Sequence, residues 1–140
     1  MKPSELTILA VDDQPDIVRL VQLYFERAEF NVVTANDGVV ALEMARKHKP
    51  DVIILDIIMP KMNGVEVLRT LKADPELKAI PVFILTVKSD SSTIIEVLRE
   101  GAERHLPKPF HPKELVAIVT SYFESLSREI QHNTEIVRRS

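Results

Sequence analysis

The chain has 140 residues, of which 45% are hydrophobic and 28% are charged, and it contains no cysteine. This length fits one domain with a sizeable core, and the lack of cysteine excludes disulfide bridges and thiolate metal sites. The net charge of -3 argues against direct binding to nucleic acid, which needs a basic surface. We find no apolar run long enough to span a membrane and no signal peptide, so we expect a cytoplasmic protein.

Short apolar runs alternate with helical patterns along the chain up to residue 124. Strands are predicted near residues 6–11, 31–34, 51–55, 81–85 and 104–107. Between them, apolar residues spaced three and four apart predict helices, and a fifth helix opens at Pro112. The runs 52–55 and 82–85 are apolar throughout, as strands buried on both sides require. The pattern therefore predicts an α/β domain with a parallel sheet covered by helices on both faces.

Polar side chains stand at the ends of four of these apolar runs. Asp12 and Asp13 follow the first run, and Asp56 ends the third. Thr86 follows the fourth run and Lys108 closes the fifth. Because the carboxyl ends of parallel strands share one edge of a sheet, we expect these five side chains to meet in one cleft.

Three carboxylates in one cleft repel one another, so the cleft favours a bound proton or cation. Mg²⁺ is the hard divalent ion that takes oxygen ligands and accompanies phosphate groups. A carboxylate held ionised beside such an ion and a lysine can attack phosphorus and form an aspartyl phosphate. Lys108 and the hydroxyl of Thr86 would then bind phosphoryl oxygens, and this chemistry indicates phosphoryl transfer to Asp56.

The chain resembles the receiver domain of two-component response regulators in a set of short motifs that occur in order. They are Val11-Asp12-Asp13, Asp56 with Met59-Pro60 and Asn63-Gly64, Leu85-Thr86, and Lys108-Pro109-Phe110. The resemblance runs from about residue 6 to 124, so we assign residues 1–124 to a receiver domain and 125–140 to a C-terminal helical extension or linker. It implies a flavodoxin-like (βα)5 fold, with a doubly wound five-stranded parallel sheet in the order 2-1-3-4-5.

The same resemblance implies roles for individual residues in binding magnesium. Asp56 would be the phosphoacceptor, and Asp13 and Asp56 would bind Mg²⁺ directly. Asp12 would hold a metal-bound water, and the backbone carbonyl of Ile58 would complete the protein ligands. By resemblance, the phosphoryl group would come from a histidine kinase or a phosphotransfer protein.

Three further residues have roles by resemblance in binding and reading out the phosphoryl group. Thr86 and Lys108 would bind it, and Lys108-Pro109 is expected to be a cis peptide, a state found essentially at proline. His105 occupies the position of the family's switch aromatic, which turns inward when Thr86 moves to the phosphoryl group. The fourth helix, fifth strand and fifth helix would then rearrange and control an output domain or a partner protein.

Three other functions are compatible with parts of this pattern. An aspartate-nucleophile phosphatase also uses a strand-end aspartate and magnesium, but it needs a second aspartate where this chain has Ile58, so we expect no enzyme turnover. An unphosphorylated pseudo-receiver would act by interaction alone, which the full set of site residues argues against. In a flavin-binding module, Asp12 and Asp13 would repel the phosphate. Taken by itself, Asp13 is also consistent with a helix N-cap.

The chain departs from common family patterns at several positions. Val87 follows the switch threonine where a smaller residue is usual, and together with Ile58 we expect it to slow exchange at the site. Glu103-Arg104 replaces a frequent acidic pair on the fifth strand. This replacement argues against the salt-bridged dimer of the winged-helix transcription-factor subgroup.

The C-terminal segment from Lys113 to Ser140 has neither glycine nor proline. Apolar and seam positions spaced by 4, 3, 4, 4, 3 and 4 are Leu115, Val119, Tyr122, Leu126, Ile130, Asn133 and Val137. This 11-residue repeat predicts a fifth helix that continues past the domain and pairs with a second copy, with Asn133 fixing the register. The alternative is that the last dozen residues fray, because Ser125, Ser127 and Thr134 are weak helix formers.

Overall fold

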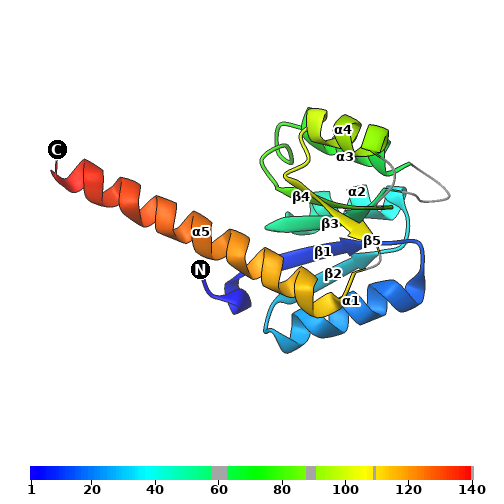
Figure 1. Ribbon diagram of the computed structural model, residues 1–140, viewed down its shortest axis with the longest axis horizontal. Coiled ribbons are helices and arrows are strands. Elements are labelled where there is room, and N and C mark those ends of the chain that lie inside the picture. Colours follow the sequence, from blue (N-terminus) through cyan, green and yellow to red (C-terminus); the bar gives the residue numbers. More distant parts are fainter. Residues whose placement is uncertain (58–62, 88–90, 109, 140) are drawn as a thin grey trace.

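A sheet of five parallel strands forms the centre of the molecule (Figure 1). The computed structural model describes residues 1–57, 63–87, 91–108 and 110–139, without the side chains of residues 87, 135 and 137–139. The strands are β1 (Thr7–Val11), β2 (Asn31–Ala35), β3 (Val52–Asp56), β4 (Val82–Val87) and β5 (Arg104–Lys108). Their order in the sheet is β2-β1-β3-β4-β5, so the predicted fold class and strand order are confirmed.

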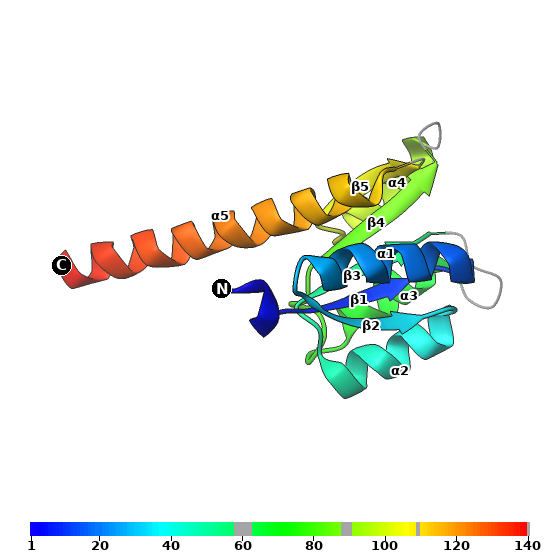
Figure 2. The same cartoon turned by 90° about the horizontal axis from the view of Figure 1, so that it is seen from below.

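Helices connect the strands and cover both faces of the sheet. They are α1 (Pro15–Arg27), α2 (Gly38–His48), α3 (Gly64–Ala73), α4 (Ser91–Arg99) and α5 (Pro112–Arg139), preceded by the short 3-10 helix η1 (Pro3–Glu5). Figures 1 and 2 show α1 and α5 on one face and α2, α3 and α4 on the other. None of the described helices is long and apolar enough to cross a membrane.

Alternate residues of the central strands feed two separate hydrophobic clusters. Ile54 of β3 packs with Phe25 of α1 and Val119 of α5 on one face. Ile53 of β3 packs with Leu68 of α3 on the other face. Because β3 is buried at every position, it has to be apolar on both faces, as its sequence indicated.

The two helices α3 and α4 are attached to the sheet to different degrees. Five residues of α3 are buried, whereas Val97 is the single buried residue among those described in α4. Arg69 of α3 links the two helices through ion pairs to Glu96 at 2.9 Å and Glu100 at 3.0 Å. These side chains are partly exposed, so solvent screens the ion pairs and the link adds little to stability.

Gly64 lets the first turn of α3 pass directly over the end of β3. Its backbone N–H donates to the carbonyl of Ile57 at 2.9 Å, and Asn63 caps the helix by accepting from the N–H of Val65 at 2.8 Å. A Cβ at Gly64 would lie 2.6 Å from Cα of Ile57 and 2.7 Å from the carbonyl oxygen of Asp56. No side chain therefore fits here unless the backbone moves.

Replacing Gly64 with Ala is expected to lower the free energy of unfolding by about 3 kcal/mol, because backbone atoms must shift to admit the methyl group. Urea unfolding of the variant measures this loss. The matched control is Gly101→Ala, where φ is 103° but the new Cβ would meet only the flexible side chain of Lys72, at 3.4 Å. There we expect a loss of about 1 kcal/mol. Equal losses in the two variants would contradict a rigid contact at Gly64.

Helix α5 is a single helix of 28 residues that projects beyond the sheet (Figures 1 and 2). The described backbone is helical to Arg139, as the continuous fifth helix requires, and the fraying of its last dozen residues stays an untested alternative. The stripe predicted from spacing also needs correction at one turn, because Phe123 is 6% exposed whereas Tyr122 is half-buried, with its ring in a T-shaped contact with Phe83. The boundary between receiver and extension at residue 124 stays a prediction.

Candidate functional site

Three aspartates meet at the carboxyl ends of β1 and β3. Asp12 and Asp13 directly follow β1, and Asp56 is the last residue of β3. One carboxylate oxygen from each lies within 4.8 Å of the others. Asp12 and Asp56 are buried, at 3% and 4% exposure, while Asp13 is exposed. The convergence expected from the strand ends is therefore confirmed for the three aspartates.

Lys108 brings a positive charge into this cluster from the end of β5. Its Nζ lies 3.1 Å from Oδ2 of Asp56 and 3.7 Å from Oδ2 of Asp12. The nearer contact is a charge-assisted hydrogen bond, and the longer one is an ion pair without a direct hydrogen bond. One lysine facing three carboxylates leaves the cleft negative, which favours a further cation.

Burial raises the pKa of Asp12. Its Oδ1 accepts from the backbone N–H of Gln14 at 3.0 Å, while its Oδ2 has no hydrogen-bond partner in the part of the chain that the structure describes. Burial, and then the nearby charge of Asp56, raise the pKa of Asp12 to about 6, against the lowering effects of the Gln14 N–H and Lys108. The residue at the N-cap of α1 is Gln14, so the N-cap interpretation of Asp13 is wrong.

Thr86 contributes a buried hydroxyl on the strand between Asp56 and Lys108. In the sheet, Leu85 pairs with Asp56 and Val87 pairs with Lys108, which places Thr86 beside both. Thr86 is 1% exposed, and its Oγ1 makes no hydrogen bond to any described residue. A buried hydroxyl without a partner is costly, so this atom is suited to a ligand that enters the cleft.

Other predicted residues lie farther from the cluster or outside the description. His105 is half-buried on β5, where it pairs with Ile84, while Thr86 pairs with Pro107. The backbone carbonyl of Ile58, the Met59-Pro60 motif, the Lys108-Pro109 peptide and the side chain of Val87 lie outside the described residues. The roles predicted for them stay predictions.

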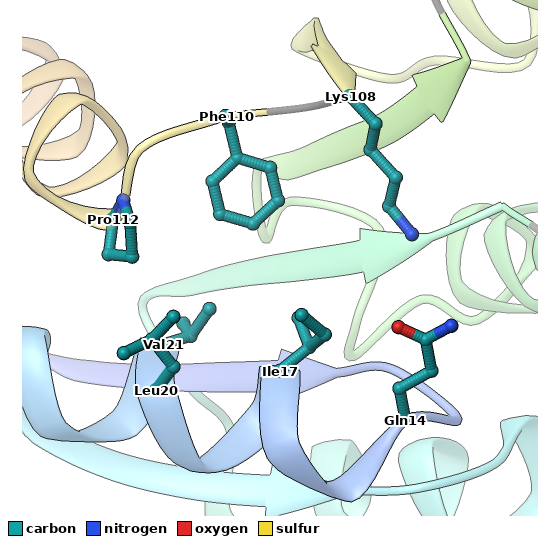
Figure 3. Close-up of a pocket in the computed structure, with 7 residues that line it drawn as sticks. All are labelled: Gln14, Ile17, Leu20, Val21, Lys108, Phe110 and Pro112. Carbon is teal, nitrogen blue, oxygen red and sulfur yellow. The ribbon is translucent and has the colours of Figure 1, made fainter.

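A cavity beside Lys108 was not predicted from the sequence. It has a volume of about 350 Å³ and is lined by Gln14, Ile17, Leu20, Val21, Lys108, Phe110 and Pro112. Figure 3 shows apolar side chains of α1 facing Phe110 and Pro112, with the Lys108 amine and the Gln14 amide toward one end. The sequence carried no clear signal for it, because Ile17, Leu20 and Val21 have the spacing of an ordinary core-facing helix.

The donor set of the cleft fits Mg²⁺. Asp12, Asp13 and Asp56 supply only oxygen ligands, which a hard divalent cation prefers over nitrogen or sulfur. The carboxylate oxygen of Asp12 that lacks a hydrogen bond is available to a metal-bound water. A bound cation would favour the charged form of Asp12, whose pKa is raised by burial and then by the nearby charge of Asp56.

Comparison with known proteins gives one consistent family. A model described as "Response regulator receiver domain" matches residues 8–120. The DNA-binding response regulator MtrA of Mycolicibacterium smegmatis is 38% identical over 112 residues, which are 80% of this chain and 48% of that protein. The alkaline phosphatase synthesis transcriptional regulatory protein PhoP of Bacillus subtilis is 40% identical over 112 residues, with shares of 80% and 46%. The chain thus spans about half the length of these curated relatives.

Solved structures agree with this assignment. The chemotaxis response regulator CheY4 of Vibrio cholerae superposes with a TM-score of 0.78 and 34% identity, covering 83% of this chain and 97% of that one. The receiver domain of a signal transduction histidine kinase from Syntrophus aciditrophicus gives a TM-score of 0.79 and 30% identity, with coverages of 88% and 93%. The fold, the acidic cluster and the match over residues 8–120 together show that this chain belongs to the response regulator receiver domain family.

Proposed function

We propose that Asp56 accepts a phosphoryl group from a histidine kinase or a phosphotransfer protein in a magnesium-dependent reaction. The observation that carries this proposal is the geometry around Asp56. Its carboxylate is buried at a strand end, lies 3.1 Å from Lys108 and has two other carboxylates within 4.8 Å. In the transfer, an Asp56 oxygen forms a bond to phosphorus as the bond between phosphorus and the donor breaks.

Each neighbour has a separate task in this scheme. Asp13 and Asp56 would hold Mg²⁺ directly, Asp12 would hold a metal-bound water, and the backbone carbonyl of Ile58, which lies outside the described residues, would complete the protein ligands. When bound, the ion neutralises charge on the phosphoryl oxygens. Lys108 donates to one phosphoryl oxygen, and the Thr86 hydroxyl, which has no partner among described residues, donates to another.

The output follows from movement of Thr86 toward the phosphoryl group. His105 on the neighbouring strand then turns inward, and the face formed by α4, β5 and α5 rearranges to control an output domain or a partner protein. The chain acts as a cytoplasmic signalling module and does not turn over a substrate as an enzyme. A phosphatase would need an aspartate at the position of Ile58, and a pseudo-receiver would not need the complete cluster.

Intact-mass measurement with a small phosphodonor tests the proposal. We expect one phosphoryl group per chain in the presence of Mg²⁺ and none after chelation, because the ion is needed to bring the donor's charge beside three carboxylates. Labelling that is equally efficient in chelator would contradict a role for the cluster in metal binding. No labelling with either small donors or histidine kinases would support the pseudo-receiver.

A further inference from the structure

Helices α3 and α4 face each other across a polar gap. A cavity of about 310 Å³ lies between them, and most of the residues that line it are polar. Glu66 and Arg69 line it from α3, and Glu96 lines it from α4. Ile57 also lines it, and because Ile57 directly follows Asp56, the gap begins beside the proposed phosphoacceptor. Charged side chains therefore lie between α3 and α4 at the edge of the cleft.

Arg69 crosses this gap and holds two carboxylates of α4 at once. Its Nε donates to Oε1 of Glu100 at 3.0 Å, and its Nη2 donates to Oε1 of Glu96 at 2.9 Å. The two glutamates are four residues apart, so they lie about one turn apart on the same face of α4. A planar guanidinium bonded to both fixes the rotation of α4 and its position along its axis, which a bond to one carboxylate alone would not do.

Arg69 also offsets repulsion between the two helices. Glu66 of α3 and Glu96 of α4 line the same cavity. The pKa of Arg69 is raised, first by its hydrogen bond with Glu100 and then by the charges of Glu100, Glu96 and Glu66, so three carboxylates act on this one guanidinium. Without it, like charges on α3 and α4 would face each other across the gap. Since Val97 is the one buried residue among those described in α4, that part of the helix has little apolar burial to oppose the repulsion.

We propose that Arg69 is a positioning residue that holds α4 in its resting place and thereby slows phosphorylation of Asp56. This role rests on the proposed function, in which α4 moves together with β5 and α5 when Asp56 is phosphorylated. The unphosphorylated chain samples both arrangements, and the rate of labelling follows the fraction of molecules in which α4 has moved. Solvent screens the ion pairs of Arg69, so their effect is small, but it is enough to change that fraction about threefold.

Hydrogen exchange of the unphosphorylated chain tests the link by itself. Arg69→Gln removes the charge and keeps a good helix former at an exposed position of α3. We expect the amides of α4 to exchange about threefold faster in this variant, because α4 leaves its resting place more often, while the amides of α1 exchange as in the parent. Exchange of α4 at the parent rate would overturn the proposal, whatever the labelling shows.

The rate of labelling by a small phosphodonor with Mg²⁺ tests the effect on Asp56. In about 20 mM salt, Arg69→Gln should be labelled about threefold faster than the parent. In about 0.5 M salt, where exposed charges are screened, the two rates should become equal. Taking the ratio of the two rates at each salt concentration cancels effects of salt on the donor and on magnesium. A parent that is not labelled would overturn the proposed function, whereas equal rates at low salt would overturn only the role of Arg69.

Reversing the charges of one pair identifies the partner on α4. Arg69→Glu should be labelled at least as fast as Arg69→Gln, and adding Glu100→Arg should bring the rate back toward that of the parent, because the pair is restored with opposite signs. The matched control is Glu76→Gln, which breaks an exposed ion pair with Lys49, at 3.5 Å, that does not involve α4. Its rates of labelling and hydrogen exchange should equal those of the parent. A double variant that stays fast, or equal acceleration in Glu76→Gln, would overturn the role of Arg69.

Discussion

Asp56→Asn is expected to abolish phosphoryl labelling and at the same time to stabilise the fold. The amide cannot attack phosphorus, so no acceptor remains in the cleft. It also removes one of three carboxylates that lie within 4.8 Å of one another, while Lys108 keeps Asp12 as a partner. We expect a gain of about 1–2 kcal/mol in the free energy of unfolding at pH 7, from the relief of like-charge repulsion. Intact mass and urea unfolding measure the two effects.

Asp51→Asn is the matched control, because Asp51 precedes the same strand at its opposite end. The carboxylate of Asp51 accepts from the N–H of Thr7 at 2.8 Å, so its replacement should cost about 1 kcal/mol and leave labelling unchanged. Undiminished labelling of Asp56→Asn would sink the assignment of the phosphoacceptor. A loss of stability in that variant would show that the pair with Lys108 outweighs repulsion within the cluster.

Lowering the pH from 7.5 to 5 is expected to stabilise the metal-free protein through Asp12. The pKa of this group is about 6 in the fold and 3.8 ordinarily, so the fold binds the proton more tightly than the unfolded chain does. Stability from this group therefore rises as pH falls through 6 and levels off below 3.8. The expected gain between these two pH values is about 1–2 kcal/mol, read as the difference between the parent and Asp12→Asn in urea unfolding at each pH.

The stabilisation of the fold by magnesium should become weaker as the pH falls, the opposite of the effect of the proton on Asp12. At pH 7.5, a concentration ten times Kd should stabilise the fold by about 1.4 kcal/mol, because the ion binds only the folded cluster. At pH 5, the proton on Asp12 replaces a charge that favours the ion, so the stabilisation should shrink. An equal shift in melting temperature at both pH values would contradict the assignment of Asp12 to the metal site, and Asp12→Asn should remove most of the pH dependence.

Sequence predicted the strands and the cluster well, for a physical reason. Strands buried on both faces must be apolar throughout, and the runs ending at Leu55 and Leu85 have this pattern, so they were predicted as central strands. Once the strands are parallel, their polar ends meet without further assumptions, as Asp12, Asp56 and Lys108 do.

Features that depend on side-chain packing were harder to predict. Spacing alone could not decide whether Tyr122 or Phe123 continues the buried stripe of α5, because both are aromatic and adjacent. Asp12 and Asp13 are identical in sequence, and only the turn after β1 decides that the first is buried and the second exposed. The cavity beside Lys108 arises between α1 and the start of α5, segments that are far apart in the chain.

Helices α3 and α4 are held in place to different degrees, as Gly64 and Val97 show. On one side, the start of α3 rests on the backbone of Asp56 and Ile57 with no room for a methyl group. On the other side, α4 has one buried anchor among its described residues and an exposed link through Arg69. A change of charge at Asp56 should therefore displace α3 very little. The same change should displace α4 more readily, because α4 is held less tightly.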